Sequence, residues 1–315
     1  DDNHPSKTDL KDPKTIAKLV IEGRYSEPSI PEGIYAELRI ANNNRLKIKK
    51  DINRIKNKVS RWLKIYFPEY TEIFKDWTGK ASLMILEKIS LPSEVQKCDI
   101  NEINNLWRDK KVRAVGIKRA KKLLKVSKNS IGSSEGLVTA KLEIQGLIEE
   151  YKLKQKQHQQ WAEIIEELLE EIPNAKLLTE IKGIGVLTVG CFIAEIGDIT
   201  KYKSPKQIQK LAGLALKENS SGKHKGRTSI SKRGRKRLRT ALFQVAMPLV
   251  GRVKEFKDLH KYYTTRKNNP LKKKQSIIAI CCKLIRIFYA ILTKGVKYSS
   301  EKLVNDIRRP EVKAA

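Results

Sequence analysis

The sequence predicts a mainly α-helical protein. Two long segments, 48–66 and 137–172, carry apolar residues at alternating steps of three and four, and strand signals are few along the whole chain. Such steps place apolar side chains on one face of a helix, whereas a strand needs strict alternation. With 315 residues the chain is long enough for several domains. We divide it into four regions, 1–30, 31–130, 131–172 and 173–315.

The composition indicates a polyanionic partner. Lys and Arg number 66 against 35 Asp and Glu, a formal net charge of +31. Such a surplus gives salt-dependent affinity for phosphate backbones, although a ribosome-associated or merely soluble basic protein would share it. A hydrophobic content of 40% argues against a disordered basic tail, because it is enough to build cores.

The cysteines and the hydropathy pattern predict a location. The four cysteines are Cys98, Cys191, Cys281 and Cys282. No Cys-x-x-Cys pair occurs among them, so we expect buried thiols in a reducing compartment rather than a zinc site. We expect no signal peptide and no membrane partner, since the best apolar run, 277–292, is interrupted by Lys283 and Arg286. The predicted location is the cytosol.

The region 131–172 is predicted to be a coiled coil. Its seam residues are Leu137, Ala140, Ile144, Leu147, Tyr151, Lys154, His158, Trp161, Ile165, Leu168 and Ile172. The seam spans five heptads, with Lys154 and His158 as polar interruptions, and Pro173 ends the helix. It can pack against another long helix of the same chain or against a second copy. The length of the stripe favours a second copy, and hence a homo-oligomer, a dimer or a tetramer.

The region 31–130 is predicted to be helical, with a shorter seam on a lysine-rich helix. The residues of this seam are Ile48, Ile52, Ile55, Val59, Trp62 and Tyr66. Another short helix is expected after Asp12-Pro13, with Asp12 as its N-cap. Helical patterns recur at 92–126, 204–214, 232–250 and 272–292.

A glycine-rich turn at 177–185 resembles a helix-hairpin-helix element. Lys182, Gly183 and Gly185 lie between an apolar segment and an apolar helix. Glycines there allow backbone N–H groups at a helix N-terminus to approach a phosphate closely. A tight turn between two helices without any ligand explains the pattern equally well.

The segment 223–239 is dense in cations and contains no acid. Its members are Lys223, Lys225, Arg227, Lys232, Arg233, Arg235, Lys236, Arg237 and Arg239. Phosphate contact is the favoured interpretation. Arg237 and Arg239 also lie on a predicted amphipathic helix, so their side chains can simply line its exposed side.

A Ser-Ser-Gly turn precedes this basic segment. A serine hydroxyl is a weak nucleophile until a neighbour activates it, and nearby cations would attract a phosphodiester. Taken alone, such a turn is far more often an ordinary loop, and His224 is more often a surface histidine than a base.

The combined motifs resemble the insertion sequence 110/116/902 transposase family. The C-terminal motifs are Ile181-x-Gly183-Ile184-Gly185, Ala194-Glu195-Ile196-Gly197-Asp198, Leu211-Ala212-Gly213-Leu214, Ser221-Gly222 and Ile230-Ser231-Lys232-Arg233-Gly234. At the front, Thr8-Asp9-Leu10-Lys11-Asp12 resembles the motif that closes the family's RuvC-like nuclease domain. The resemblance covers essentially the whole chain, and the order of the motifs is highly specific.

The resemblance implies an enzyme that excises and integrates an insertion sequence through a covalent serine-DNA intermediate. Ser221 would be the nucleophile, and Asp9 and Asp12 would bind Mg²⁺ with two carboxylates that precede Asp1 in the family pattern. The implied partners are donor and target DNA and a guide, or bridge, RNA, and the implied location is the cytoplasm of a bacterium, associated with the nucleoid. Pro13 departs from the alanine common in the family. Region 1–30 would end an RNase H/RuvC-like α/β domain, and 173–315 would be a helical serine domain. The alternative is a non-catalytic remnant that binds DNA or RNA.

Overall fold

A computed structural model describes residues 11–23, 30–217, 220–221, 224–225 and 228–308. Apart from four strands of two residues each, every regular element in these ranges is a helix. The prediction of a mainly α protein is confirmed. The first region shows one helix, α1 (Lys11–Ile21), whose residues from 12 onward are all exposed. Asp12 is the second residue of the helix, inside its first turn, so the prediction of Asp12 as N-cap is wrong.

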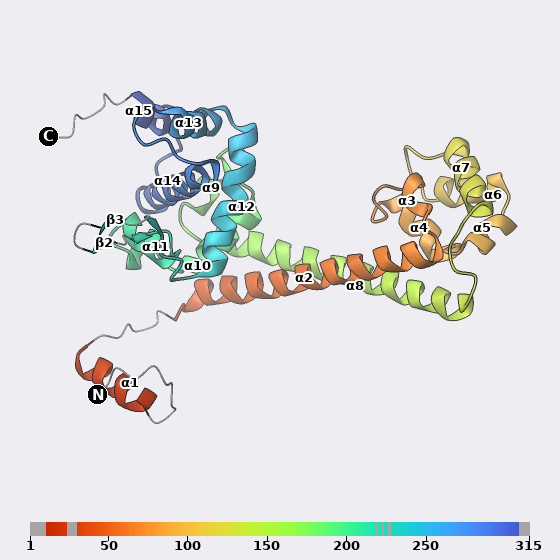
Figure 1. The fold of residues 1–315 in the computed structure, drawn as a ribbon, viewed down its shortest axis with the longest axis horizontal. Coiled ribbons are helices and arrows are strands. Elements are labelled where there is room, and N and C mark those ends of the chain that lie inside the picture. The colour runs from red at the N-terminus through yellow and green to blue at the C-terminus, as the bar shows by residue number, and fades with distance from the viewer. Residues whose placement is uncertain (1–10, 24–29, 218–219, 222–223, 226–227, 309–315) are drawn as a thin grey trace.

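Two long helices form the axis of the molecule, α2 (Gly33–Tyr66) and α8 (Leu137–Glu170). Figure 1 shows them side by side and antiparallel, with a group of helices at each end. Both predicted seams are confirmed, because every seam residue is buried or half-buried. The indole Nε1 of Trp62 also donates to the carbonyl oxygen of Ala140 at 2.9 Å.

The two seams therefore pack on each other within one chain. Long partner helices satisfy an apolar stripe of this length without a second copy. The coiled coil thus includes α2, from region 31–130, as well as α8. The sequence led us to expect self-association through the α8 seam. A second copy would have to contact the same residues that already pack against α2. The predicted domain boundaries and the oligomer stay predictions.

Five short helices connect α2 to α8 and form what we call the tip domain, residues 67–136. They are α3 (Tyr70–Ile73), α4 (Lys80–Lys88), α5 (Pro92–Lys97), α6 (Ile100–Arg108) and α7 (Ile117–Lys128). The predicted helical stretch 92–126 is thus three helices. The break before α6 arises because Asp99 caps it, accepting the backbone N–H of Glu102 at 2.7 Å. Tyr70 and Trp107 lie fully inside the core of this domain, which extends onto Trp62 of α2.

The remaining helices form the C-terminal domain, residues 173–308. They are α9 (Ala175–Thr179), α10 (Val186–Ile196), the 3-10 helix η1 (Ile199–Lys201), α11 (Pro205–Leu211), α12 (Lys236–Arg252), α13 (Lys254–Thr265), α14 (Lys273–Lys294) and α15 (Ser300–Arg308). Phe192 and Phe288 meet edge to face at 4.9 Å between ring centroids in its core. This core extends onto the adjacent ends of α2 and α8.

Helix α14 is long and apolar enough by length and composition to cross a membrane, which no other described helix is. Half of its most apolar window is nevertheless buried against the rest of the protein. Cys281, Leu284 and Phe288 belong to the core of the C-terminal domain. We therefore interpret α14 as the central helix of a folded core.

All four cysteines are thiols, as expected, although Cys98 and Cys282 are half-buried rather than buried. Burial raises the pKa of the Cys281 thiol to about 12. The apolar surroundings of α14 therefore keep this thiol protonated and unreactive near neutral pH.

We call the antiparallel pair α2 and α8 the hairpin. Replacing Ile165 with aspartate should unfold the junction between this hairpin and the C-terminal domain. Ile165 is 0% exposed and its side chain lies against Gly190 of α10, whereas its neighbour Ile164 is 38% exposed. A carboxylate at 165 would lack water and a partner, costing about 3–5 kcal/mol. Ile164→Asp is the matched control and should cost under about 1 kcal/mol. Urea denaturation measures both. If Ile165→Asp changed only the sedimentation coefficient and not the stability, the seam would instead bind a second copy.

Candidate functional site

The predicted nucleophile lies on a short β-arm between α11 and α12. Strand β1 (Leu216–Lys217) pairs with β4 (Ser229–Ile230), and β2 (Ser220–Ser221) pairs with β3 (His224–Lys225), both antiparallel. The register makes Ser221 the partner of His224. Ser221 is thus the last residue of a strand, not part of a loop as the sequence suggested. Strand propensity is low for such polar residues, which is why the arm was missed.

Two glycines lock the base of this arm. Gly213 has φ +67° and Gly234 has φ +129°, both in the region that favours glycine. A Cβ on Gly234 would lie 2.3 Å from the carbonyl oxygen of Leu211, so only glycine fits. Backbone bonds tie the two segments together: the N–H of Arg235 donates to Leu211 at 2.7 Å, and that of Lys232 donates to Gly213 at 3.0 Å. The motifs Leu211-Ala212-Gly213-Leu214 and Ile230-Ser231-Lys232-Arg233-Gly234 are therefore bonded to each other. We call this base of the arm the glycine platform.

Three of the arginines predicted to bind nucleic acid have partners within the protein. Arg239 donates through Nη1 to the carbonyl oxygens of Ala212 at 2.8 Å and Lys232 at 3.3 Å. Arg235 donates to the carbonyl oxygen of Glu195, and Arg237 to the Oδ1 of Asn43 on α2. Charge-assisted bonds of this kind hold the platform and the hairpin in place. These bonds give the three arginines a structural role, and their contact with phosphate stays a prediction.

The other cations of the segment divide into two groups. Lys232, Arg233 and Lys236 are exposed on the platform and in the first turn of α12. Lys232 also has a positive φ of 56°. Lys223 and Arg227 lie outside the described residues, and Lys225 is described only as the backbone of β3. The exposed cations stand at the base of the arm that carries Ser221, where they can attract a phosphate backbone.

The predicted helix-hairpin-helix turn lies between α9 and α10. Gly183 has φ +89°, and a Cβ there would lie 2.9 Å from the Cδ2 of Leu249. This glycine therefore fits the turn against α12. Gly185 is the N-cap of α10, exposed, with no atom near its missing Cβ, and Lys182 is exposed beside it. A backbone phosphate could approach the N-terminus of α10 at Gly185, as the sequence pattern suggested.

The C-terminal end of α10 carries a polar junction that sequence analysis missed. Arg39 on α2 donates to the carbonyl oxygens of Ala194 at 2.9 Å and Glu195 at 3.2 Å. Burial and the neighbouring Arg235 lower the pKa of the Arg39 guanidinium. Two cations thus complement the negative end of the helix dipole. Since Arg39 is 155 residues away from Ala194 in sequence, no local pattern could have indicated the contact.

Of the two carboxylates assigned to metal binding, one lies within the described residues. Asp9 lies outside the described residues, and Asp12 is exposed on α1. Within the described ranges no three His, Cys, Asp or Glu side chains gather as a metal site would require. The oxygen donors of Asp12 suit Mg²⁺ chemically, but one carboxylate does not hold the ion without the others.

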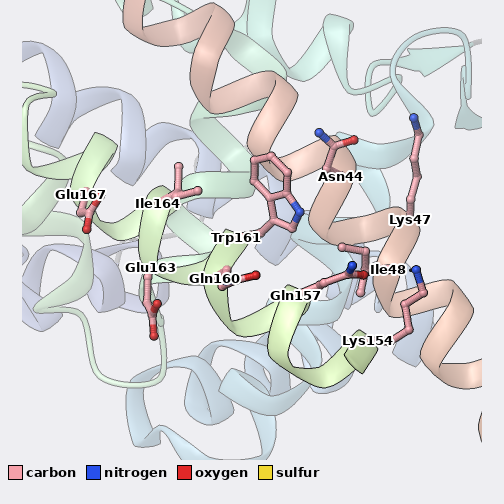
Figure 2. A pocket seen from close by; sticks show the side chains of 10 residues that line it. All are labelled: Asn44, Lys47, Ile48, Lys154, Gln157, Gln160, Trp161, Glu163, Ile164 and Glu167. Carbon is pink, nitrogen blue, oxygen red and sulfur yellow. Dashed lines mark hydrogen bonds between the residues drawn. The ribbon is translucent and has the colours of Figure 1, made fainter. Parts of the chain in front are cut away.

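A groove of about 810 Å³ opens between α2 and α8 beside Lys154, a polar interruption of the α8 seam (Figure 2). Its lining residues are Asn44, Lys47, Ile48, Lys154, Gln157, Gln160, Trp161, Glu163, Ile164 and Glu167. The lysines lie toward one end and the glutamates toward the other (Figure 2). Beside it, burial and the cations Arg45 and Lys49 lower the pKa of His158, which is therefore neutral at pH 7. The mixed charge favours neither a phosphate nor a cation here.

Two family models match the chain. One, described as the transposase IS116/IS110/IS902 family, matches residues 175–264. The other, a DEDD transposase domain of the IS110 type, matches residues 1–68, and such a domain is typically metal-dependent. Residues 69–174, which include most of the tip domain, lie between the two matches.

Relatives among known proteins agree with these matches. The pilin gene-inverting protein of Moraxella bovis is 37% identical over 146 residues, 45% of this chain and 44% of the relative. The transposase for insertion sequence element IS1111A of Coxiella burnetii is 30% identical over 118 residues, 38% of this chain and 32% of the relative. An insertion element IS110 protein of Streptomyces coelicolor is 22% identical over 302 residues, which are 94% of this chain and 73% of the relative.

The chain spans less than half the length of the Moraxella and Coxiella relatives that it matches. The two domain matches fall in the order that the sequence motifs predicted, at the front and in the C-terminal domain. The glycine platform explains physically why two of those motifs occur together. The chain belongs to the IS116/IS110/IS902 family of transposases.

Proposed function

We propose that this protein catalyses DNA strand exchange with Ser221 as the nucleophile. The Oγ of Ser221 forms a bond to phosphorus, the bond from phosphorus to the leaving deoxyribose oxygen breaks, and the serine proton passes to that oxygen. Attack by the free hydroxyl of another strand reverses the step and joins new partners. Excision and integration of an insertion sequence both consist of these two steps.

The observation that best supports this proposal is the position of Ser221 in a family transposase domain. It ends strand β2 on an arm whose base is fixed by Gly213 and Gly234. A nucleophile gains from such fixed positioning, because orientation lowers the entropy lost on reaching the transition state. The exposed Lys232 and Arg233 at the base favour a negatively charged substrate.

Two partners complete the proposal. Asp9 and Asp12, with the family's other carboxylates, would hold Mg²⁺, which when bound stabilises negative charge on phosphodiester oxygens. A structured guide RNA would select donor and target DNA, and a second protein copy would share the site. These parts rest on the family resemblance. Two of the relatives are named as a pilin gene-inverting protein and a transposase, and inversion and transposition both rearrange DNA.

A plasmid carrying the insertion sequence tests the proposal. Expression of the protein together with the element's flanking non-coding RNA should yield the excised circle and the rejoined plasmid, both detected by PCR across the junctions. Omitting the RNA should remove both products. If the protein binds the element's ends but yields no junction with the RNA present, it is instead a non-catalytic binding protein.

A further inference from the structure

The tip domain carries a second dense run of cations, at 108–128. Its members are Arg108, Lys110, Lys111, Arg113, Lys118, Arg119, Lys121, Lys122, Lys125 and Lys128, with Asp109 as the single acid among them. The run is about as basic as the segment beside Ser221. It lies between the two family matches, so the family assignment does not account for it.

All ten of these cations are exposed, and none forms an ion pair with a described residue. Helix α7 is amphipathic: Ala120, Leu123 and Ser127 are buried against the tip core. The opposite side presents what we call the tip basic face, Lys118, Lys121, Lys125 and Lys128. Arg119 and Lys122 have local roles, since Arg119 lies over the ring of Phe74 and Lys122 donates to the carbonyl oxygen of Glu72 at 3.3 Å.

Only part of this arrangement of charge benefits the fold: Lys125 and Lys128 lie in the last turn of α7, where cations complement the helix dipole, but the first turn does not benefit. Helix α7 has no acid in its first turn, where the helix dipole is already positive, and Lys118 and Arg119 stand there. Lysines at spacings of three and four on one helix face also repel one another. Bound phosphates would relieve both unfavourable effects, whereas acidic side chains within the tip domain do not.

The chemistry of the surface favours a duplex over an unpaired strand. Single-stranded nucleic acid binds through aromatic side chains on which bases stack. The aromatic residues of the tip domain are Phe67, Tyr70, Phe74, Trp77 and Trp107, and every one is buried. Only Ile117 and Ile131 are exposed among its large apolar side chains. Such a surface can contact phosphates but cannot stack bases or enter a bilayer.

The hairpin places this surface far from Ser221. Helices α2 and α8 are each 34 residues long, about 51 Å at 1.5 Å per residue. Figure 1 shows the tip domain and the C-terminal domain at opposite ends of that rod. A duplex rises about 3.4 Å per base pair, so roughly 15 base pairs span the same length.

We propose that the tip basic face binds the phosphate backbone of duplex DNA, roughly 15 base pairs from the DNA held at the C-terminal domain. The contact is independent of sequence and orients the substrate along the hairpin. The proposal rests on the proposed function in that DNA is taken as the substrate; it requires no catalysis.

The test compares two triple variants in a Ser221→Ala background, so that no strand is cut. Lys118, Lys121 and Lys125 become glutamine in one; Lys75, Lys88 and Lys97, exposed elsewhere on the tip domain, become glutamine in the other. Both lose three charges from the same domain. The probes are a labelled duplex DNA and a duplex RNA of 40 base pairs, titrated by fluorescence anisotropy between about 50 and 200 mM salt.

The α7 variant should bind the DNA about ten- to a hundredfold more weakly near 100 mM salt, with a slope of log K against log salt reduced by about 2–3. The control variant should match the parent. The inference is overturned if the α7 variant retains the DNA affinity and slope, or if its loss is confined to duplex RNA. If the parent itself does not bind duplex DNA, the inference also fails, whereas the proposed function is decided separately by junction PCR with the guide RNA present.

Discussion

Ser221→Ala is expected to abolish excision, lowering recombination by at least about 10³-fold. The hydroxyl oxygen is the atom that would become bonded to phosphorus, and alanine supplies no substitute. DNA affinity and its salt dependence should stay the same, because they depend on exposed cations such as Lys232 and Arg233. Junction PCR measures excision, and anisotropy with labelled duplex DNA measures binding.

The matched control is Ser220→Ala, one residue earlier in the same strand β2. It removes a hydroxyl from the same arm, so it should perturb the backbone pairing with β3 equally. We expect it to retain much of the excision activity. Normal excision by Ser221→Ala, or a larger loss from Ser220→Ala, would show that the nucleophile has been assigned to the wrong residue.

Gly234→Ala is expected to inactivate the protein through the platform rather than through the chemistry. The φ of +129° is strained for any L residue, and the new Cβ would stand 2.3 Å from a backbone oxygen that has little room to move. Together these effects should cost about 2–4 kcal/mol, either as lost stability or as displacement of the β-arm. Thermal unfolding and junction PCR should therefore both report a loss, with DNA affinity reduced less.

Gly146→Ala provides the opposite case in the same chain. Gly146 lies within α8, and nothing surrounds the position of its Cβ. Alanine there should stabilise the protein by about 0.5–1 kcal/mol, because glycine is unfavourable inside a helix. Equal stability of the Gly234→Ala and Gly146→Ala proteins would contradict the argument that the platform requires glycine.

The sequence predicted most of what depends on local periodicity. Both seams were identified residue by residue, because steps of three and four are recorded directly in the order of the amino acids. The partner of the long seam could not be predicted, because periodicity does not show whether the facing stripe belongs to the same chain. The tip domain was missed as a unit for a related reason: its core brings Trp62 and Trp107, 45 residues apart, together through several short helices.

The candidate site was predicted by motif, and the geometry adds structural roles for some of its residues. The cluster of cations at 223–239 indicated phosphate binding, yet Arg235 and Arg239 hold backbone carbonyls that lie 27 to 40 residues earlier in the sequence. The density of cations in a sequence does not show which of them bind a ligand and which donate hydrogen bonds to the protein's own backbone. In the sequence Gly213 and Gly234 stand in two separate motifs, and only their mutual contact shows that these segments form one platform.

The most direct test of the central claim is the site of covalent attachment. The protein is incubated with donor DNA and guide RNA, quenched in denaturant, digested with nuclease and protease, and the modified peptide is sequenced by mass spectrometry. We expect a nucleotide linked through phosphate to Ser221, and no such adduct from Ser221→Ala. An adduct on Ser220 or another residue, or efficient excision without any protein-linked DNA, would contradict the account.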